Sequence, residues 1–492
     1  MSFRRDAVLA ILLIVLTALY ILALPTRHFT SDAINRLEFT EGHNLFELWH
    51  SQHLLAQLPG YAAYLVLNNL RAYQAIQLID ALMSGITVAA IYAAARSLGA
   101  KRWIALLAGL AICFSYGFWH YATDPDVYSP VMMAVALLLL ALIRYLNAPT
   151  NRRIVWLSLA AALAVLMHQM NVELAGLIGL ALLTAHGWKV NVPVRHVIIY
   201  GGLIVVIVVI AYGIGWQSAT AYSQQALGVS YSFLGYVERY FNMASAGQAT
   251  WGKSLHLDTI PQVGYAILKS WTLPPLRSRL TLIDAVLVGG LMASAVFWFL
   301  YGLAALRKFA PAARLIALIS IGTLIANVIS AWWWQAGNIK FYLPMQSIVI
   351  VLAVVYVVNA DAARPILRHL AYLVVSVSLI CLVILHIRNT LTYETQGGVF
   401  VVAAEMEAYH GSGTPTAQFA DVTQMRILPL ISPYQSSALP ADFCTESLTQ
   451  PIWLVVRAVP QGACPALDSQ VHTEDYQADT SRQMWKIYAP KR

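Results

Sequence analysis

The chain has few charged residues. Only 11% of its 492 residues are Asp, Glu, Lys or Arg, whereas 59% are hydrophobic, and its mean hydropathy is +0.64. Soluble domains usually contain about 25% charged residues, so this composition excludes a soluble globular protein. The high hydrophobicity also excludes intrinsic disorder. Four cysteines in this length are too few for a secreted disulfide scaffold.

Two further features are missing. The net charge is +8, but the basic residues lie in short loops between apolar runs and never form a cluster of the kind that binds nucleic acid. We therefore expect no nucleic-acid partner. The chain also lacks a Gly-rich phosphate loop or Walker sequence, so we expect no nucleotide hydrolysis.

Long apolar runs dominate what is present. A bilayer core needs about 20 mostly apolar residues per helix. We find eleven such runs, at residues 6–24, 76–98, 103–121, 127–146, 154–170, 171–188, 196–215, 283–306, 314–332, 342–359 and 369–387. The sequence therefore predicts a mostly α, polytopic membrane protein with about 11 transmembrane helices.

Lys and Arg collect in every second loop, for example at Arg4, Arg96, Arg152 and Arg314. The positive-inside rule places these loops and the N-terminus in the cytoplasm, as in a multi-pass protein of the plasma (inner) membrane. An odd number of spans then puts the C-terminus outside. The first run has no small-residue cleavage site after it, so we interpret it as an uncleaved span.

The chain divides into two predicted domains. Residues 1–387 form the transmembrane domain, with long outer loops at 25–75 and 216–282. Residues 388–492 are more polar and contain short β-like runs, so we expect a small extracytoplasmic α/β domain there. Cys444 and Cys464 would lie in an oxidising compartment and could form a disulfide; two free thiols are the alternative.

Acidic residues at the outer ends of spans are candidates for chemistry, because ionisable groups at membrane depth are costly and mark function. Asp32 lies just beyond the first span and could act as a general base on a hydroxyl; the alternative is that Ser31 or Asp32 caps a helix. Asp124 and Asp126 flank a proline in a short outer loop. Such a pair can bind a hard cation, Mg²⁺ or Mn²⁺, or simply form a turn.

Basic and aromatic residues lie at the same depth. His168 and Glu173 occupy the outer turn between two spans, where a hydrogen-bonded turn residue is the alternative to a phosphate or hydroxyl partner. Lys340 is the lone basic residue of the short outer loops, and its ammonium would suit an anionic lipid headgroup. His53 and Tyr61 lie in the first outer segment, which we expect to be an amphipathic surface helix.

These elements together resemble the GT-C superfamily of membrane glycosyltransferases, and in particular prokaryotic relatives of protein O-mannosyltransferases. Leu58-Pro59-Gly60-Tyr61 with Tyr64 is similar to a Pro-Pro-Gly-Tyr-Pro segment of that family. Phe114-Ser115-Tyr116-Gly117-Phe118-Trp119, running on to Asp126-Val127-Tyr128, resembles its Phe-Ser-x-x-Phe-Trp stretch followed by an acid, Val and Tyr. Leu166-Met167-His168 resembles the histidine that opens the sixth span. The likeness covers about residues 1–190 and continues as topology to about 387.

The resemblance implies a membrane glycosyltransferase that uses a polyprenyl-phosphate sugar donor outside the cytoplasm. Asp32 would be the catalytic carboxylate and Asp126 a second acid. Asp124 makes the loop similar to the D-x-D of oligosaccharyltransferases, whose activity is metal-dependent, so a divalent cation is one option. The acceptor would be a hydroxyl of a protein, glycan or lipid. The tail lacks a Trp-Trp-Asp-Tyr-Gly element, so recognition of a peptide sequon is unsupported.

The chemistry of this transfer suggests roles for the remaining candidate residues. A leaving phosphate develops charge in the transition state, and Lys340 and His168 are expected to bind it. His53, Tyr61 and Glu173 are expected to line the same pocket, and a single displacement would invert the anomeric centre. The competing class is a multi-span transporter or lipid flippase with an accessory outer domain. It would show paired repeats with broken helices and ionisable residues at the bilayer midplane, where Asp80 is the main acid.

Overall fold

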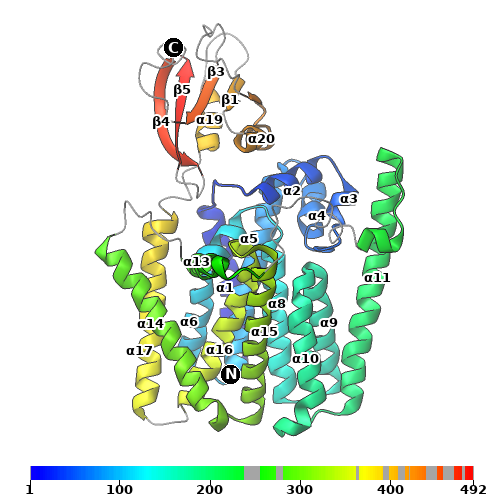
Figure 1. Ribbon diagram of the computed structural model, residues 1–492, viewed down its shortest axis with the longest axis vertical. Coiled ribbons are helices and arrows are strands. Elements are labelled where there is room, and N and C mark those ends of the chain that lie inside the picture. Colours follow the sequence, from blue (N-terminus) through cyan, green and yellow to red (C-terminus); the bar gives the residue numbers. More distant parts are fainter. Residues whose placement is uncertain are drawn as a thin grey trace.

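The protein consists of a helical bundle with a small domain stacked on one end (Figure 1). The computed structural model describes residues 2–237, 255–272, 281–361, 365–391, 398–407, 416–419, 422–438, 452–457, 470–478 and 483–490. The start of the first helix and the domain that contains the C-terminus lie at opposite ends of the long axis.

A helix forms at each of the predicted apolar runs. Ten of these runs contain one long helix each: α1 (Ser2–Ala23), α5 (Ala72–Ser97), α8 (Tyr128–Asn147), α9 (Asn151–Met167), α10 (Val172–Thr184), α11 (Val194–Leu227), α14 (Leu282–Ala305), α15 (Pro311–Gln335), α16 (Leu343–Asp361) and α17 (Pro365–Leu385). The run at 103–121 is split into α6 (Arg102–Cys113) and α7 (Tyr116–Thr123), which meet at an angle of 62°.

Fewer helices than predicted reach the length and hydropathy expected of a membrane span. Within the described residues, nine helices are long and apolar enough to cross a membrane, or ten if the bent pair of α6 and α7 is one span. The run at 154–170 accounts for the difference, because α9 has only 17 residues. At 1.5 Å per residue it is about 25 Å long, which is shorter than a typical hydrocarbon core.

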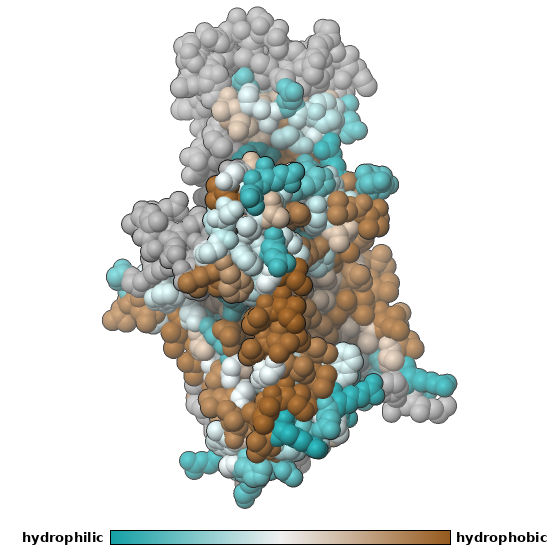
Figure 2. Space-filling view, turned by 90° about the vertical axis from the view of Figure 1, so that its right-hand side faces the viewer, coloured by the Kyte–Doolittle hydropathy of each residue, from teal (hydrophilic) through white to brown (hydrophobic). Residues whose placement is uncertain are grey.

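Small residues allow the central helices to pack closely. Helix α5 is rich in buried alanines and packs against α1 and α8. A Cβ atom at Gly85 would lie 2.5 Å from the backbone oxygen of Ile14 on α1, so only glycine fits at this crossing. Close approach through small residues is typical of helices in membranes. Figure 2 shows hydrophobic residues across the middle of one face and hydrophilic residues toward both ends.

The first outer segment folds over the end of the bundle. It contains α2 (Ser31–Glu41), α3 (Leu45–Leu48) and α4 (Leu58–Val66). Thr30 caps α2, because its side chain accepts a hydrogen bond from the Ala33 amide at 3.2 Å. The alternative that Ser31 or Asp32 caps this helix is therefore wrong, and the Asp32 carboxylate is available for other contacts.

The second long outer segment is partly helical. Helix α11 extends to Leu227, well beyond the predicted end of its span, and α13 (Ile260–Trp271) follows. The short helix η6 (Ile339–Tyr342) precedes α16 and contains Lys340. These elements lie at the same end of the bundle as α2.

The described part of the tail contains both helices and strands. Its five-stranded sheet has the order β2-β1-β3-β5-β4, in which β1 is parallel to β2 and β3, while β5 is antiparallel to β3 and β4. The elements are α19 (Gly398–Glu407), β1 (Thr416–Phe419), α20 (Val422–Ile431), β2 (Gln435–Ala438), β3 (Ile452–Arg457), β4 (Gln470–Ala478) and β5 (Gln483–Pro490). Cys444 and Cys464 lie outside the described residues.

The tail domain rests on α2. Ile34 and Leu37 of α2 share a hydrophobic cluster with Val402 and Phe419 of the domain. Arg426 on α20 also bonds Glu38, with Nη2 2.5 Å from a carboxylate oxygen. The domain thus covers the helix whose first turn contains Asp32.

Candidate active site

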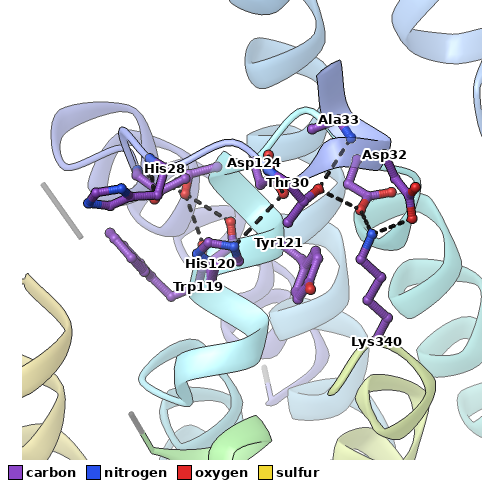
Figure 3. Close-up of polar contacts among 12 residues, drawn as sticks. His28, Thr30, Asp32, Ala33, Trp119, His120, Tyr121, Asp124 and Lys340 are labelled. Carbon is purple, nitrogen blue, oxygen red and sulfur yellow. Dashed lines mark hydrogen bonds and ion pairs between the residues drawn. The ribbon is translucent and has the colours of Figure 1, made fainter. Parts of the chain in front are cut away.

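Lys340 joins two carboxylates from distant segments. Its Nζ lies 2.6 Å from Oδ2 of Asp32 and 2.7 Å from Oδ2 of Asp126. Figure 3 shows the lysine side chain extending toward Asp32, with Thr30 and Tyr121 beside it. The lysine is buried. The ammonium also lies 5.8 Å from the centre of the Tyr121 ring, so it is held by both charge and an aromatic face.

The two carboxylates differ in their surroundings. The side chain of Asp32 is 61% exposed, whereas that of Asp126 is 2% exposed. Oδ1 of Asp126 accepts a hydrogen bond from the Val127 amide at 2.6 Å, and Oδ2 accepts one from the Thr30 hydroxyl at 3.2 Å. Asp126 is therefore fixed in place, and Asp32 faces solvent from the first turn of a helix, where a negative charge is favourable.

Asp124 forms the back of the same site. It is fully buried, and the Thr30 amide lies 3.4 Å from both of its carboxylate oxygens. Burial raises the pKa of Asp124 to about 7, although His120, 3.8 Å away, opposes this change. Burial also tends to raise the pKa of Asp126. The ammonium of Lys340 has the opposite effect, and the pKa of that carboxyl lies below its usual range. One carboxyl thus titrates near neutrality while the other stays ionised.

The carboxylates do not fit the predicted divalent cation. Oδ2 of Asp126 is taken by the ammonium of Lys340 and Oδ1 by a backbone amide. In the described part of the chain, no group of three or more His, Cys, Asp or Glu side chains could hold a metal ion. The lysine occupies the position where a cation would neutralise these acids, so we derive no step through a metal.

Three histidine rings extend the site, two from the first outer segment and one from the turn after α9. The ring centres of His53 and His168 are 4.4 Å apart, and those of His50 and His53 are 5.2 Å apart. The connection to the lysine passes through Tyr128, whose ring centre is 5.8 Å from that of His168 and 6.0 Å from Nζ of Lys340. The structure thus brings His168 and His53 to the edge of the acidic cluster.

The buried His168 is a hydrogen-bond donor rather than a cation. Its Nδ1 accepts a bond from the Met170 amide at 3.1 Å, which leaves the proton on Nε2. Burial and the neighbouring His53 lower its pKa well below the usual value. A neutral ring with Nε2–H can bind an oxygen of a phosphate or sugar, but it adds no positive charge.

Tyr61 and Glu173 have partners elsewhere. The hydroxyl of Tyr61 lies 3.2 Å from Nδ1 of His43. Glu173, on α10, accepts a hydrogen bond from the hydroxyl of Ser330 on α15. The described contacts place neither residue against Lys340.

Arg36 is a site residue that the sequence analysis did not find. It donates to the backbone oxygen of Asp126 and lies 3.3 Å from Oδ2 of Asp80, and both charged side chains are buried. A Cβ atom at Gly60 would lie 2.6 Å from Nη2 of Arg36, so the Pro-Gly-Tyr element leaves room for this arginine. Its position one helical turn after Asp32 was the available signal, because an arginine there interrupts the apolar face of α2.

Comparisons with known proteins bear on the family and the fold. The family described as dolichyl-phosphate-mannose-protein mannosyltransferase matches residues 62–216. No curated protein matches the chain. Among solved structures, ArnT from Cupriavidus metallidurans bound to undecaprenyl phosphate is similar over 97% of each chain, with 13% identity and a TM-score of 0.55.

Two other solved structures are less similar. The oligosaccharyltransferase of Archaeoglobus fulgidus has 12% identity and a TM-score of 0.45, with 90% of this chain and 68% of that chain covered. The S. cerevisiae protein O-mannosyltransferase Pmt1-Pmt2 complex bound to the sugar donor has 14% identity and a TM-score of 0.38, with 44% of this chain and 34% of that chain covered. The family match and the ArnT-like fold confirm the predicted resemblance to GT-C glycosyltransferases related to protein O-mannosyltransferases.

Proposed function

We propose that this GT-C membrane glycosyltransferase transfers a sugar from a polyprenyl-phosphate donor to an acceptor hydroxyl. The observation that carries the proposal is the buried ammonium of Lys340 between an exposed and a buried carboxylate. The fold supports the choice of donor, because the similar ArnT structure contains undecaprenyl phosphate. The site is expected to face the extracytoplasmic side, as the basic loops at the opposite end predict.

Lys340 is the residue proposed to bind the phosphate of the donor. Asp32 is largely exposed, so a phosphate oxygen can take its place on Nζ of Lys340. Asp126 remains paired, because it is buried and held by Thr30 and Val127. Charge-assisted bonds to phosphate strengthen as the leaving group gains negative charge. Nε2–H of His168 is proposed to bind a further phosphate or sugar oxygen.

The displaced Asp32 is proposed as the general base. The acceptor oxygen forms a bond to the anomeric carbon while the bond from that carbon to the phosphate oxygen breaks. The bonding electron pair leaves with the phosphate, and the hydroxyl proton moves to the carboxylate of Asp32. A single displacement inverts the anomeric centre, and a phosphate leaving group needs no separate general acid. Asp126 assists by fixing the position of Lys340.

The acceptor is proposed to approach beneath the tail domain. This domain packs on α2 through Ile34 and Leu37 and bonds Glu38 through Arg426. It therefore borders the exposed side of Asp32, where a protein, glycan or lipid hydroxyl would enter. The transporter alternative is not favoured, because its expected midplane acid, Asp80, is paired with Arg36.

The donor proposal can be tested with the purified full chain. Undecaprenyl phosphate is added to the protein in mild detergent, and retention of the lipid is measured by native mass spectrometry. We expect the wild type to retain the lipid and Lys340→Gln to lose most of it. Lys308→Gln, which removes an exposed lysine from another loop, is the matched control and should retain it.

Two results would contradict the donor proposal. The first is a wild-type protein that does not retain undecaprenyl phosphate. The second is equal retention by the Lys340→Gln and Lys308→Gln proteins. The stereochemistry is tested separately, by determining the anomeric configuration of the product relative to the donor; a retained configuration would exclude the single displacement.

A further inference from the structure

A cavity lies at the end of the bundle opposite Lys340. It has a volume of about 1040 Å³ and is lined by residues of α1, α5, α8 and α9. Helix α8 begins at Tyr128, beside Lys340, and ends at Asn147, which lines this cavity. A 20-residue helix is about 30 Å long, so the end of α8 at the mouth of the cavity and the Lys340 cluster are separated by about the thickness of a bilayer core.

Arginines surround the mouth of the cavity. Arg144 and Arg152 are exposed and Arg153 is half-buried. Nη1 of Arg153 donates to the backbone oxygens of Arg144 at 2.7 Å and Ala148 at 3.2 Å, which holds the turn between α8 and α9.

Acidic groups do not balance these three charges. Asp6 is the acid that lines the cavity, and it is paired with Arg96 at 3.2 Å and Arg102 at 2.7 Å. Among the described lining residues, three arginines therefore remain without a carboxylate. The mouth of the cavity is positively charged.

A helix terminus adds to this positive potential. Helix α9 has 17 residues and begins at the mouth, where the Thr150 side chain accepts a bond from the Arg153 amide. The start of a helix has a partial positive charge and unpaired amides that favour anions. The arginines and the helix terminus therefore both favour an anion at the mouth of the cavity.

The inner wall of the cavity is apolar. Leu137 and Leu140 lie one to two turns before Arg144 on α8, and Trp156, Leu159 and Leu163 follow Arg153 on α9. Trp156 is 58% exposed. The wall therefore continues from the charged mouth toward the middle of the membrane, with an aromatic residue near the boundary, as is usual for lipid-facing surfaces.

We infer that this cavity binds an anionic diacyl phospholipid, with the phosphodiester against Arg144, Arg152 and Arg153 and an acyl chain along the wall around Trp156. Charge complementarity selects an anionic headgroup, because basic pockets between transmembrane helices bind such groups. The apolar wall selects a lipid over free phosphate. The proposed headgroup position lies at the opposite end of α8 from Lys340 and does not depend on the proposed transfer reaction.

Lipid selectivity provides the test. The delipidated full chain is titrated with phosphatidylglycerol and with phosphatidylcholine of identical acyl chains, and binding is measured by native mass spectrometry. We expect tighter binding of phosphatidylglycerol. Arg152→Gln should weaken this binding about fivefold, and Arg144→Gln with Arg152→Gln about twenty-five-fold, since each arginine near a membrane surface contributes a similar amount. Binding of phosphatidylcholine should weaken less, because its cationic choline offsets the charge of its phosphodiester.

Two variants complete the experiment. Arg307→Gln removes an exposed arginine from the loop between α14 and α15, which does not line the cavity, and it should bind like the wild type. Trp156→Ala should weaken phosphatidylglycerol binding while all arginines remain. Equal binding of the two lipids, or wild-type selectivity in the double arginine variant, would overturn the inference. Displacement of the lipid by an equal concentration of inorganic phosphate would show a simple anion site instead.

Discussion

Asp32 and Asp126 contact the same ammonium at nearly the same distance, yet their surroundings differ. Asp32 begins an outer helix and is mostly exposed, whereas Asp126 lies in a buried loop. A buried ion pair that loses one partner leaves an uncompensated charge, whereas an exposed pair contributes little to stability. The comparison indicates that Asp126 positions the lysine, whereas Asp32 can be replaced on the ammonium by a phosphate oxygen of the donor.

The largest expected effect is on turnover in Asp32→Asn. Removal of a general base should lower the rate of sugar transfer about 10³-fold, because proton transfer by a positioned group contributes on the order of 10²–10⁴. The thermal stability should stay close to that of the wild type, since the Asp32 side of the pair is exposed and the buried Lys340 keeps Asp126. Transfer is measured with a polyprenyl-phosphate sugar donor. Asp258→Asn, at an exposed outer acid, is the control; normal turnover in Asp32→Asn would remove Asp32 from the role of base.

The next effect is on stability in Asp126→Asn. Loss of one partner from a buried pair typically costs about 3–5 kcal/mol, and we expect the lower end because Lys340 keeps Asp32. The free energy of unfolding is measured in detergent for both asparagine variants. The comparison between the two carboxylates fails if Asp126→Asn is as stable as Asp32→Asn.

A smaller effect concerns pH, through Asp124. Its pKa is raised from 3.8 to about 7, so the folded state binds a proton more tightly than the unfolded state does. The stabilising contribution is present below about pH 4 and is lost as the pH rises through 7. Asp124→Asn should remove this part of the pH dependence. Thermal midpoints recorded between pH 4 and 8 check it, and parallel curves for the wild type and the variant would contradict it.

The smallest effect is expected where the tail domain contacts α2. Arg426 bonds Glu38 and Asn35, with Nη2 2.8 Å from the Asn35 oxygen, but the pair with Glu38 is about one-third exposed. Its loss should therefore cost less than about 1 kcal/mol. A double-mutant cycle of Arg426→Gln and Glu38→Gln measures the coupling. A coupling energy near zero would show that the apolar contacts alone hold the domain on α2.

Local patterns in the sequence were sufficient for several features. Each predicted apolar run contains helical structure, because a long hydrophobic stretch is stable in a bilayer only as a helix. The resemblance to GT-C glycosyltransferases rested on short motifs such as Phe114–Trp119 and was confirmed by the family match. The acids and the lone outer lysine were identified as candidates, because charge at membrane depth is costly wherever it occurs.

Only the tertiary structure decided how these candidates meet. Asp32 and Lys340 are 308 residues apart, and no local pattern encodes their contact. The pairing of Arg36 with Asp80, the bend between α6 and α7 and the capping of α2 by Thr30 likewise depend on neighbours from other segments. Hydropathy is a property of each run by itself and fixes which segments become helices. The contacts between charged groups arise from packing, which brings distant segments together and determines which carboxylate is buried.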